Sequence, residues 1–223
     1  AFAAFDADDS QGCAVVTGSG DKAFAAGADI GEMGGLPATD FYTKAFFDGW
    51  QSDIASKTRK PWIAAVNGFA LGGGFEIVLA CDIVVAAEHA RFGLPEPKVG
   101  LMAAAGGAQR LVRQIPLKVA MGMMLTAEHI TAQRAMDLGL VNEVVGASDL
   151  VAAAGRWADR ILECSPLSVR ATKQAALNSL DRPLPDSIGI QNYPAVIELL
   201  KSEDAKEGPR AFAEKRKPAW RGR

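Results

Sequence analysis

The residues best suited to chemistry are two glutamates, each of which follows a short apolar run and a turn. Glu76 comes after three successive glycines, Gly72 to Gly74, in an apolar stretch that predicts a helix. Glu96 stands between two prolines, which stiffen its loop. Two carboxylates can divide general-acid and general-base work when burial raises the pKa of one of them. Taken singly, Glu76 also fits a surface residue that compensates a helix dipole, and Glu96 fits an ordinary loop carboxylate.

The glycine run supplies a second kind of reactive group, the backbone N–H. Successive glycines are tolerated where the backbone must approach another group closely or adopt a positive φ. Just before a helix they expose N–H groups at the positive end of the helix dipole, which suits a phosphate, a carboxylate or an oxyanion. The segment AAGAD at 25–29 is a further glycine turn. Two such turns could form an oxyanion hole, although AAGAD alone fits a tight structural turn equally well.

The elements that would hold these residues alternate between strand and helix, which predicts an α/β fold. Apolar runs predict strands at 13–17, 62–66, 83–87, 99–102 and 140–145. Periodicity predicts helices at 1–5, 40–56, 75–81, 107–114, after Pro116, 167–180, 187–200 with a break at Pro194, and 202–217. Thr131 and Ser148 predict the caps of a short helix ending at Gly139 and of a long helix at 149–163.

Composition excludes several classes of function. The net charge is −2, so no basic field favours nucleic acid. No apolar run reaches the roughly 18 residues of a membrane span, and no signal-peptide pattern occurs. The three cysteines are far apart, and with only two histidines they predict neither a disulfide framework nor a metal site. We therefore expect a cytoplasmic protein without a nucleic-acid or membrane partner.

Five segments, in consistent order and nearly end to end, resemble the crotonase (enoyl-CoA hydratase/isomerase) superfamily. They are KAFAAGADI at 22–30, AAVNGFALGGGFE at 64–76, ACDIVVAAEHARFGLPE at 80–96, GGAQRL at 106–111 and AFAEKRK at 211–217. The resemblance implies an α/β spiral of ββα units over residues 1–127, followed by a helical trimerisation and CoA-capping region over 128–223. The chain begins with Ala1, and we expect that the family's opening strands, which contribute to the CoA pocket, are missing.

The resemblance also implies roles for individual residues in acyl-CoA chemistry. The backbone N–H groups of Ala28 and Gly73 would hold the thioester oxygen, and Glu76 and Glu96 match the two glutamates of hydratases. The positions that match CoA-contacting residues of the family are Lys22, Ala26, Asp29, Ile30, Phe212 and Lys215. Phe212 and Lys215 would reach the CoA of a neighbouring subunit, where Lys215 would pair with the 3′-phosphate.

Having both glutamates favours an enoyl-CoA hydratase of lipid or fatty acid metabolism, a lyase that adds water to a trans-2-enoyl-CoA. Glu76 would activate the water and Glu96 would protonate C2, and no metal or other cofactor is required because CoA is part of the substrate. The alternatives are an enoyl-CoA isomerase, a specialised hydroxyacyl-CoA dehydratase and, in another class, a non-catalytic acyl-CoA-binding protein. We expect a homotrimer or a dimer of trimers.

One position departs from the family pattern. Hydratases commonly carry a Pro-Gly-containing segment before the GG of the GGAQRL region, but here residues 101–105 read LMAAA. Ala104 aligns with the family's glycine near the catalytic water. Its extra methyl group would narrow the water site or change the preferred acyl group.

Overall fold

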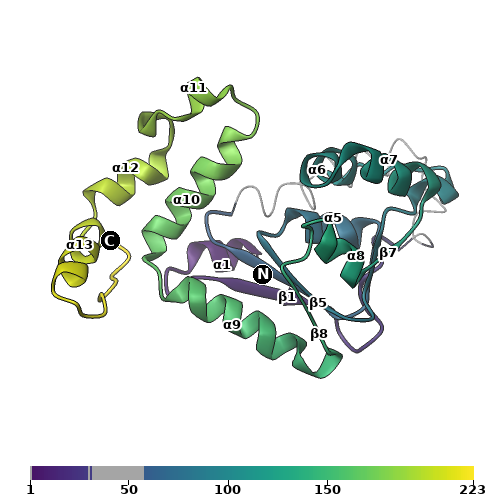
Figure 1. The fold of residues 1–223 in the computed structure, drawn as a ribbon, viewed down its shortest axis with the longest axis horizontal. Helices are drawn as coiled ribbons and strands as arrows, with labels where there is room; N and C mark the ends of the chain where they lie inside the picture. Colours follow the sequence, from purple (N-terminus) through teal and green to yellow (C-terminus); the bar gives the residue numbers. More distant parts are fainter. Residues whose placement is uncertain (1, 30, 32–57) are drawn as a thin grey trace. The chain divides into compact units, whose positions relative to one another are not determined.

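The computed structural model describes residues 2–29, 31 and 58–223, so the predicted helix at 40–56 lies outside the described residues. Contacts divide the chain into two compact units, which are described separately (Figure 1). The first unit contains Ala1–Ala14, Thr58–Pro61 and Trp157–Arg223, and the second contains Val15–Lys57 and Trp62–Arg156. The functional division expected after residue 127 stays a prediction.

The second unit is built on two four-stranded sheets. The first sheet has the order β1-β3-β5-β8, with bounds β1 Ala14–Thr17, β3 Trp62–Val66, β5 Ile83–Ala87 and β8 Glu143–Val145. The second has the order β2-β4-β6-β7, with bounds β2 Ala23–Ala25, β4 Phe69–Leu71, β6 Arg91–Gly93 and β7 Ile130–Thr131. From β1 to β6 the chain therefore places successive strands in alternate sheets, whereas β6 and β7 belong to the same sheet.

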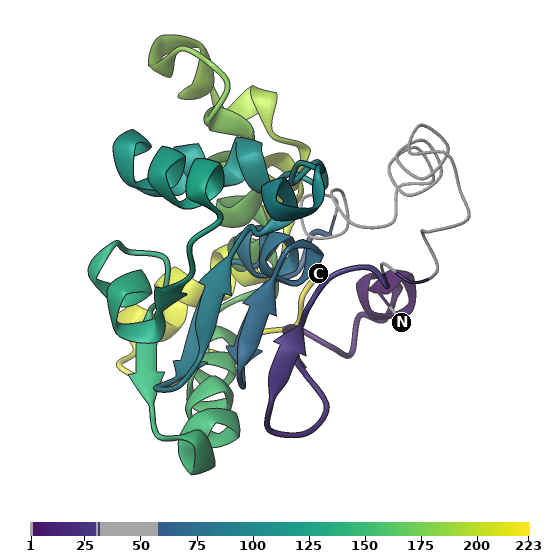
Figure 2. The same cartoon turned by 90° about the vertical axis from the view of Figure 1, so that its right-hand side faces the viewer.

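A repeating step of two strands and a helix follows from this alternation. β3 and β4 lead into α5 (Gly73–Ala80), and β5 and β6 lead into the 3₁₀ helix η1 (Glu96–Val99) and then α6 (Gly107–Gln114). Equivalent strands of successive steps pair in parallel, β3 with β5 and β4 with β6, while β6 pairs with β7 in antiparallel fashion (Figure 2). The α/β fold and its ββα steps agree with the prediction.

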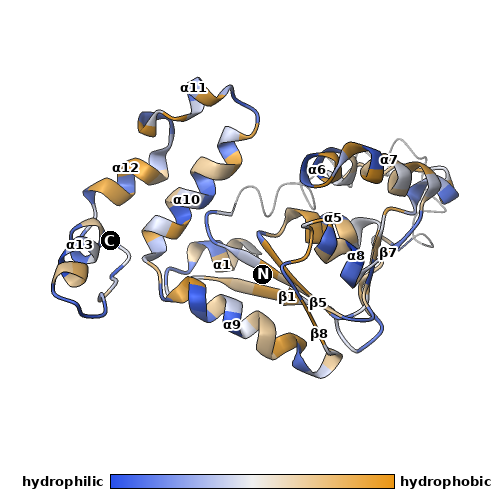
Figure 3. Ribbon diagram, viewed as in Figure 1, coloured by the Kyte–Doolittle hydropathy of each residue, from blue (hydrophilic) through white to orange (hydrophobic). Residues whose placement is uncertain are grey.

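The core of the second unit explains why the apolar runs became strands. Every residue of β3 is buried, so both faces of the strand need apolar side chains. Phe75 of α5 and Phe92 of β6 are fully buried, with ring centroids 5.6 Å apart in a tilted arrangement. In the hydropathy view the strand β5 is hydrophobic, whereas the helices carry both kinds of residue (Figure 3). Burial of α5 between sheet and helix is what positions the glycine turn that precedes it.

The remaining helices complete both units. In the second unit they are α7 (Leu117–Thr126), α8 (Ala132–Asp137) and the 3₁₀ helix η2 (Ala147–Asp149), and α9 (Leu150–Leu162) runs on into the first unit. In the first unit they are α1 (Phe2–Ala7), α10 (Pro166–Ser179), α11 (Leu184–Ser187), η3 (Ile190–Asn192), α12 (Pro194–Lys201) and α13 (Asp204–Ala213). Across the described residues, no helix has the length and apolar character that a membrane crossing requires.

Hydrogen bonds to buried polar groups hold the first unit together. Asp204 is buried and accepts from Ser165 Oγ at 2.8 Å and from the backbone N–H of Arg221 at 2.8 Å, which folds the C-terminal tail back onto α13. Lys60 is also buried, and its Nζ donates to the carbonyl oxygens of Phe5 (2.7 Å) and Asp8 (2.6 Å). The carbonyl groups that end α1 are thereby satisfied by a cation.

Predicted and observed elements agree best where the local pattern is strong. The strands at 62–66 and 83–87 and the helix at 107–114 have the predicted ends, and Thr131 caps α8 by accepting from the N–H of Arg134 at 3.1 Å. Pro194 begins α12, which confirms the predicted break. The three-residue strands β2, β4 and β6 and the two-residue strand β7 were not predicted.

Three local predictions were wrong. Residues 99–102 form no strand, because the backbone turns at Gly100 (φ +74°) and the N–H of Leu101 returns to the carbonyl oxygen of Glu96 at 3.0 Å. The predicted strand at 140–145 is limited to β8, because the N–H of Leu140 binds the carbonyl oxygen of Ala135 at 2.9 Å. Ser148 lies inside η2 and does not cap α9.

Candidate active site

The glycine turn places the start of α5 at the end of β4. Gly72 has φ +54°, a left-handed conformation that favours glycine, and its N–H donates to the carbonyl oxygen of Gly93 at 3.0 Å. No side chain caps the helix, whose first residue is Gly73. The N–H groups of a first helical turn have no acceptor within the helix, so α5 presents donors and a positive dipole end here.

The AAGAD turn packs against this helix start. A Cβ added to Gly74 would overlap the carbonyl oxygen of Ala25, and one added to Gly27, which has φ +95°, would lie 3.0 Å from the backbone nitrogen of Gly73. A residue with a side chain would therefore not fit at position 27 or 74 without displacing the backbone of the other segment. The two glycine turns predicted to supply N–H donors therefore lie side by side, with Ala28 immediately after Gly27.

Glu76 lies in the first turn of α5 and is almost completely buried, with 4% of its surface exposed. Its Oε1 accepts from the backbone N–H of Gly107 at 2.8 Å. Burial, together with the negative charge of Glu96, raises the pKa of Glu76 to about 7, against the opposing effects of the Gly107 and Ala105 N–H groups. The interpretation of Glu76 as an exposed, dipole-compensating residue is therefore wrong.

Glu96 begins η1 and is half-buried beside the glycine turn. Burial raises the pKa of its carboxyl group. A Cβ added to Gly72 would lie 3.3 Å from Glu96 Oε1. The carboxylate therefore packs against the backbone of Gly72, where a side chain would crowd it. Glu96 Oε2 is buried and has no hydrogen-bond partner among the described residues. A buried carboxylate oxygen without a partner marks a place where a water or a substrate group would bind.

The turn between η1 and α6, together with the start of α6, also holds and charges the surroundings of Glu76. Arg110 of α6 donates from Nη1 to the carbonyl oxygen of Ala105 at 3.2 Å, and its charge also favours the ionised form of Glu76. Ala104, the residue that departs from the family pattern, lies in this turn and is half-buried between the buried residues Ala103 and Ala105. The turn and the start of α6 therefore bring together the Gly107 donor, the Arg110 charge and the Ala104 methyl group.

These groups together can perform proton transfer beside a polarised carbonyl. The two carboxyl groups have pKa values raised towards neutrality, so one can accept a proton and the other can donate one. The start of α5 and the adjacent turn offer backbone donors for developing negative charge.

The structure also places the residues expected to contact CoA. Lys22, Ala26 and Asp29 are exposed on the segment around β2, and Asp29 Oδ1 accepts from the N–H of Gly31 at 2.8 Å. Ile30 lies outside the described residues. The three described positions thus belong to the same segment of the second unit as Ala28, and their role in binding stays a prediction.

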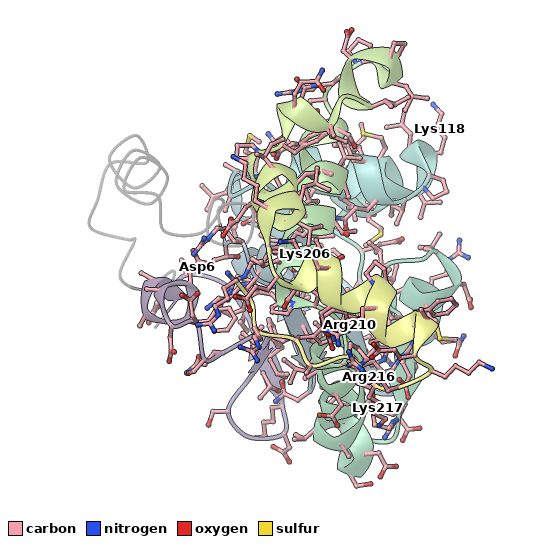
Figure 4. The ribbon with its side chains drawn as sticks, turned by 90° about the vertical axis from the view of Figure 1, so that its left-hand side faces the viewer. Asp6, Lys118, Lys206, Arg210, Arg216 and Lys217 are labelled. Carbon is pink, nitrogen blue, oxygen red and sulfur yellow. The ribbon has the colours of Figure 1, made fainter. Side chains whose placement is uncertain are left out.

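Phe212 and Lys215 belong to the first unit, at the end of α13. Phe212 is the more conspicuous, with 87% of its surface exposed, and Lys215 is exposed with φ +54°. Arg216 is instead paired with Glu207 and Glu214 at 2.6 Å each, beside Arg210 and Lys217 (Figure 4). Of the three cationic residues at 215–217, Arg216 is the one that forms these ion pairs.

Sequence reasoning missed the residues that support the two glutamates. Gly107 was interpreted only as the start of a helix, and Arg110 was noted only as part of the GGAQRL segment. The double glycine at 106–107 was the available signal, because a Cβ on Gly107 would lie 2.9 Å from Glu76 Oε1. Nothing in the local pattern linked it to a residue 31 positions earlier.

Comparison with known proteins agrees with this fold. The profile of the family described as Enoyl-CoA hydratase/isomerase matches residues 1–223. The chain is 45% identical over 210 residues to (E)-benzylidenesuccinyl-CoA hydratase of Thauera aromatica, covering 94% of this chain and 81% of that protein. It is 39% identical over 230 residues to carnitinyl-CoA dehydratase of Salmonella arizonae, covering 100% of this chain and 86% of that protein.

A solved structure extends the likeness to three dimensions. The enoyl-CoA hydratase of Bacillus anthracis superposes with a TM-score of 0.92 at 34% identity, covering 100% of this chain and 86% of that one. The chain belongs to the enoyl-CoA hydratase/isomerase family, the crotonase superfamily. Its relatives include hydratases and a dehydratase, that is, hydro-lyases of acyl-CoA thioesters.

Proposed function

We propose that this protein is an enoyl-CoA hydratase-like lyase that adds water across the double bond of a trans-2-enoyl-CoA. The observation that carries the proposal is the pair Glu76 and Glu96, both with pKa values raised by burial, beside the uncapped start of α5. A pair of this kind suits a reaction that both removes and delivers a proton. An isomerase needs to move only one proton between two carbons, so the pair favours hydration.

The thioester oxygen binds between the backbone N–H groups of Ala28 and Gly73. Negative charge grows on this oxygen when water attacks C3 and the C2–C3 double bond becomes an enolate. Both donors belong to the glycine turns that pack together, so they need no reorganisation as the charge develops. Loss of one such donor typically costs about 3–4 kcal/mol of transition-state stabilisation.

The two carboxyl groups handle the protons. The pair shares one proton, and in its reactive form that proton is on Glu96 while Glu76 is ionised. Glu76 takes a proton from water as the oxygen bonds to C3, and Glu96 delivers its proton to C2 as the enolate collapses. The proton then passes from Glu76 back to Glu96 before the next turnover. The product is a 3-hydroxyacyl-CoA, which holds all the atoms of the substrate and one water. A concerted variant, in which both carboxyl groups share that water, uses the same residues. No electrons are transferred, so the proposal includes no redox cofactor and no metal.

The CoA portion follows the family pattern. Lys22, Ala26, Asp29 and Ile30 line its path, and Phe212 and Lys215 cap the CoA of a neighbouring subunit in a homotrimer or a dimer of trimers. In favour of self-association, the first unit exposes six large apolar side chains between residues 177 and 200, namely Leu177, Leu180, Leu184, Ile188, Ile190 and Leu200. Large apolar patches on a surface mark sites where another chain binds.

A second candidate is hydration or dehydration of a specialised acyl-CoA, and Ala104 favours it. The methyl group of Ala104 stands in the turn that supports Glu76, where it would change the space for water and acyl group. The relatives named above act as a hydratase of (E)-benzylidenesuccinyl-CoA and a dehydratase of carnitinyl-CoA, so the same fold accommodates acyl groups unlike crotonyl. The two candidates share their chemistry and differ only in substrate.

Turnover in ¹⁸O-labelled water tests the proposal. The protein is incubated with crotonyl-CoA, with longer 2-enoyl-CoAs and with 2-enoyl-CoAs that carry branched or aryl acyl groups. The masses of the products are then measured by mass spectrometry. The proposal predicts a 3-hydroxyacyl-CoA that carries one labelled oxygen. A 3-enoyl-CoA of unchanged mass would indicate an isomerase instead. CoA binding without turnover of any of these thioesters would support the binding-only alternative.

A further inference from the structure

A polar network in the second unit holds the backbone that precedes Ala28. Asn67 follows β3, and its side chain reaches the loop between β1 and β2. Its Nδ2 lies within hydrogen-bond distance of three carbonyl oxygens, those of Gly20 (2.8 Å), Gly18 (3.2 Å) and Ala23 (3.2 Å), which share its two N–H donors. Its Oδ1 accepts from the N–H of Gly18 at 3.1 Å. One side chain therefore ties down the whole loop that leads into β2.

This set of partners needs a side chain that both donates and accepts, as an amide does. Three acceptors and one donor surround the side chain, so a carboxylate, which only accepts, would face three carbonyl oxygens without a proton to share. Alanine would leave all four backbone groups without this partner. The backbone of Asn67 is itself held, because His89 Nε2 donates to the carbonyl oxygen of Asn67 at 3.1 Å.

The network acts at an irregularity in β2. This strand pairs with β4 in parallel, and its register shifts between Ala23 and Ala25. Such a bulge changes the direction of the residues that follow it. The carbonyl oxygen of Ala23 is held by Asn67, and that of Ala25 lies against Gly74. The bulge is thus fixed at both ends, and Ala28 follows three residues later.

The two donors of the oxyanion hole are not equally supported. Gly73 belongs to α5, whose eight residues hold its N–H in place. Ala28 follows a strand of only three residues, so its direction depends on whatever fixes that strand. We propose that Asn67 is a positioning residue for the oxyanion hole, because its side-chain amide fixes the bulge of β2 and so aims the Ala28 N–H at the thioester oxygen. This inference rests on the proposed function, which assigns the Ala28 donor.

Infrared spectroscopy of a bound thioester tests the inference directly. Butyryl-CoA carrying ¹³C at the thioester carbon is saturated and cannot be hydrated, so it reports only the polarisation of its carbonyl group. Two N–H donors lower the stretching frequency of that carbonyl on binding. The variant Asn67→Ala should lose about half of this shift, and its kcat for hydration should fall at least tenfold, while KM changes less. Asn67→Ser, whose hydroxyl keeps one donor, should show a smaller loss and serves if Asn67→Ala does not fold.

Asn142→Ala is the matched control. Asn142 also uses its side chain to hold a backbone group of the second unit, accepting from the N–H of Val84 at 2.8 Å, but it touches neither glycine turn. It should keep the carbonyl shift and kcat even where its melting temperature falls. Equal losses in the Asn67 and Asn142 variants, or a wild-type shift in the Asn67 variants, would overturn the inference. Absence of any shift in the wild-type protein would instead overturn the oxyanion hole and the proposed function.

Discussion

At the residue scale, the surroundings of Glu76 act on its ionisation in opposite directions. Burial and the nearby Glu96 favour the protonated form, while the Gly107 N–H and the Arg110 guanidinium favour the ionised form. The balance brings the pKa of Glu76 to about 7, where a carboxylate is a useful general base near neutral pH. Because Glu76 and Glu96 interact, the measured pKa values belong to the pair.

This balance predicts how hydration depends on pH. The reaction needs Glu76 ionised and Glu96 protonated, so kcat/KM should pass through a maximum and fall at both lower and higher pH, and the limb that reports Glu76 should lie near pH 7. Arg110 lowers the pKa of Glu76, so removing its charge must raise that pKa. In Arg110→Gln the limb of the pH–rate profile that reports Glu76 should move to higher pH by roughly half to one unit.

Arg113→Gln is the control for this shift. Arg113 lies one turn further along α6 and donates to the carbonyl oxygen of Gln109 at 2.9 Å, and it is not among the groups that act on Glu76. Its profile should coincide with that of the wild-type protein. An Arg110→Gln profile that is unmoved, or that moves to lower pH, would show that Glu76 does not govern the limb near pH 7.

The two candidate carboxylates were predictable from the motifs, but the backbone groups that hold them in place were not. Glu76 and Glu96 could be singled out because each follows a strand-like run and a turn. The hydrogen bond from Gly107 to Glu76 joins residues 31 positions apart through a backbone N–H. Every residue except proline has such a group, so no residue type in the sequence identifies this partner. The same applies to the backbone carbonyl oxygens that the Asn67 side chain holds.

At the scale of elements, the close approach of α5 and β2 builds the oxyanion hole. Gly74 has no space for a side chain, because a Cβ there would overlap the carbonyl oxygen of Ala25. Gly74→Ala should therefore push the helix start and β2 apart. Overpacking of this kind typically costs about 1–3 kcal/mol of unfolding free energy, and the displaced donors should lower kcat at least tenfold.

A glycine-to-alanine variant at an open position serves as the control. Gly122 of α7 has open space where a Cβ would stand, so Gly122→Ala should stabilise the protein by up to about 1 kcal/mol and leave kcat unchanged. Urea denaturation and hydration kinetics of both variants provide the comparison. A Gly74→Ala protein that matches Gly122→Ala in both measurements would show that the two turns need not approach so closely.

The elements themselves were predictable in proportion to their length and pattern. β3, β5 and α6 have strong apolar patterns and were predicted with their observed ends. β4 and β6 have three residues each, too few for a periodic pattern to emerge. Residues 99–102 looked strand-like in isolation, but a left-handed Gly100 ends η1 and turns the chain there.

At the scale of the whole molecule, the exposed apolar residues of the first unit predict self-association. Six large apolar side chains between residues 177 and 200 are between 41% and 71% exposed. Size-exclusion chromatography with light scattering should therefore give the mass of three or six chains. The variant Leu184→Glu, at a position 71% exposed, should shift the population towards smaller species. A monomeric wild-type protein at micromolar concentration would contradict the trimer and, with it, the role of Phe212 and Lys215 at a neighbour's CoA.

The most direct test of the two-carboxylate hydratase is the rate at which the enoyl thioester absorbance of crotonyl-CoA, or of the preferred thioester, disappears. Wild-type protein is compared with Glu76→Gln and Glu96→Gln, and with Glu88→Gln, an exposed glutamate of the same unit, as control. The account predicts that kcat falls at least about a hundredfold in each site variant, with KM little changed, and stays at the wild-type value in Glu88→Gln. Hydration that persists at the wild-type rate in either Glu76→Gln or Glu96→Gln would contradict it.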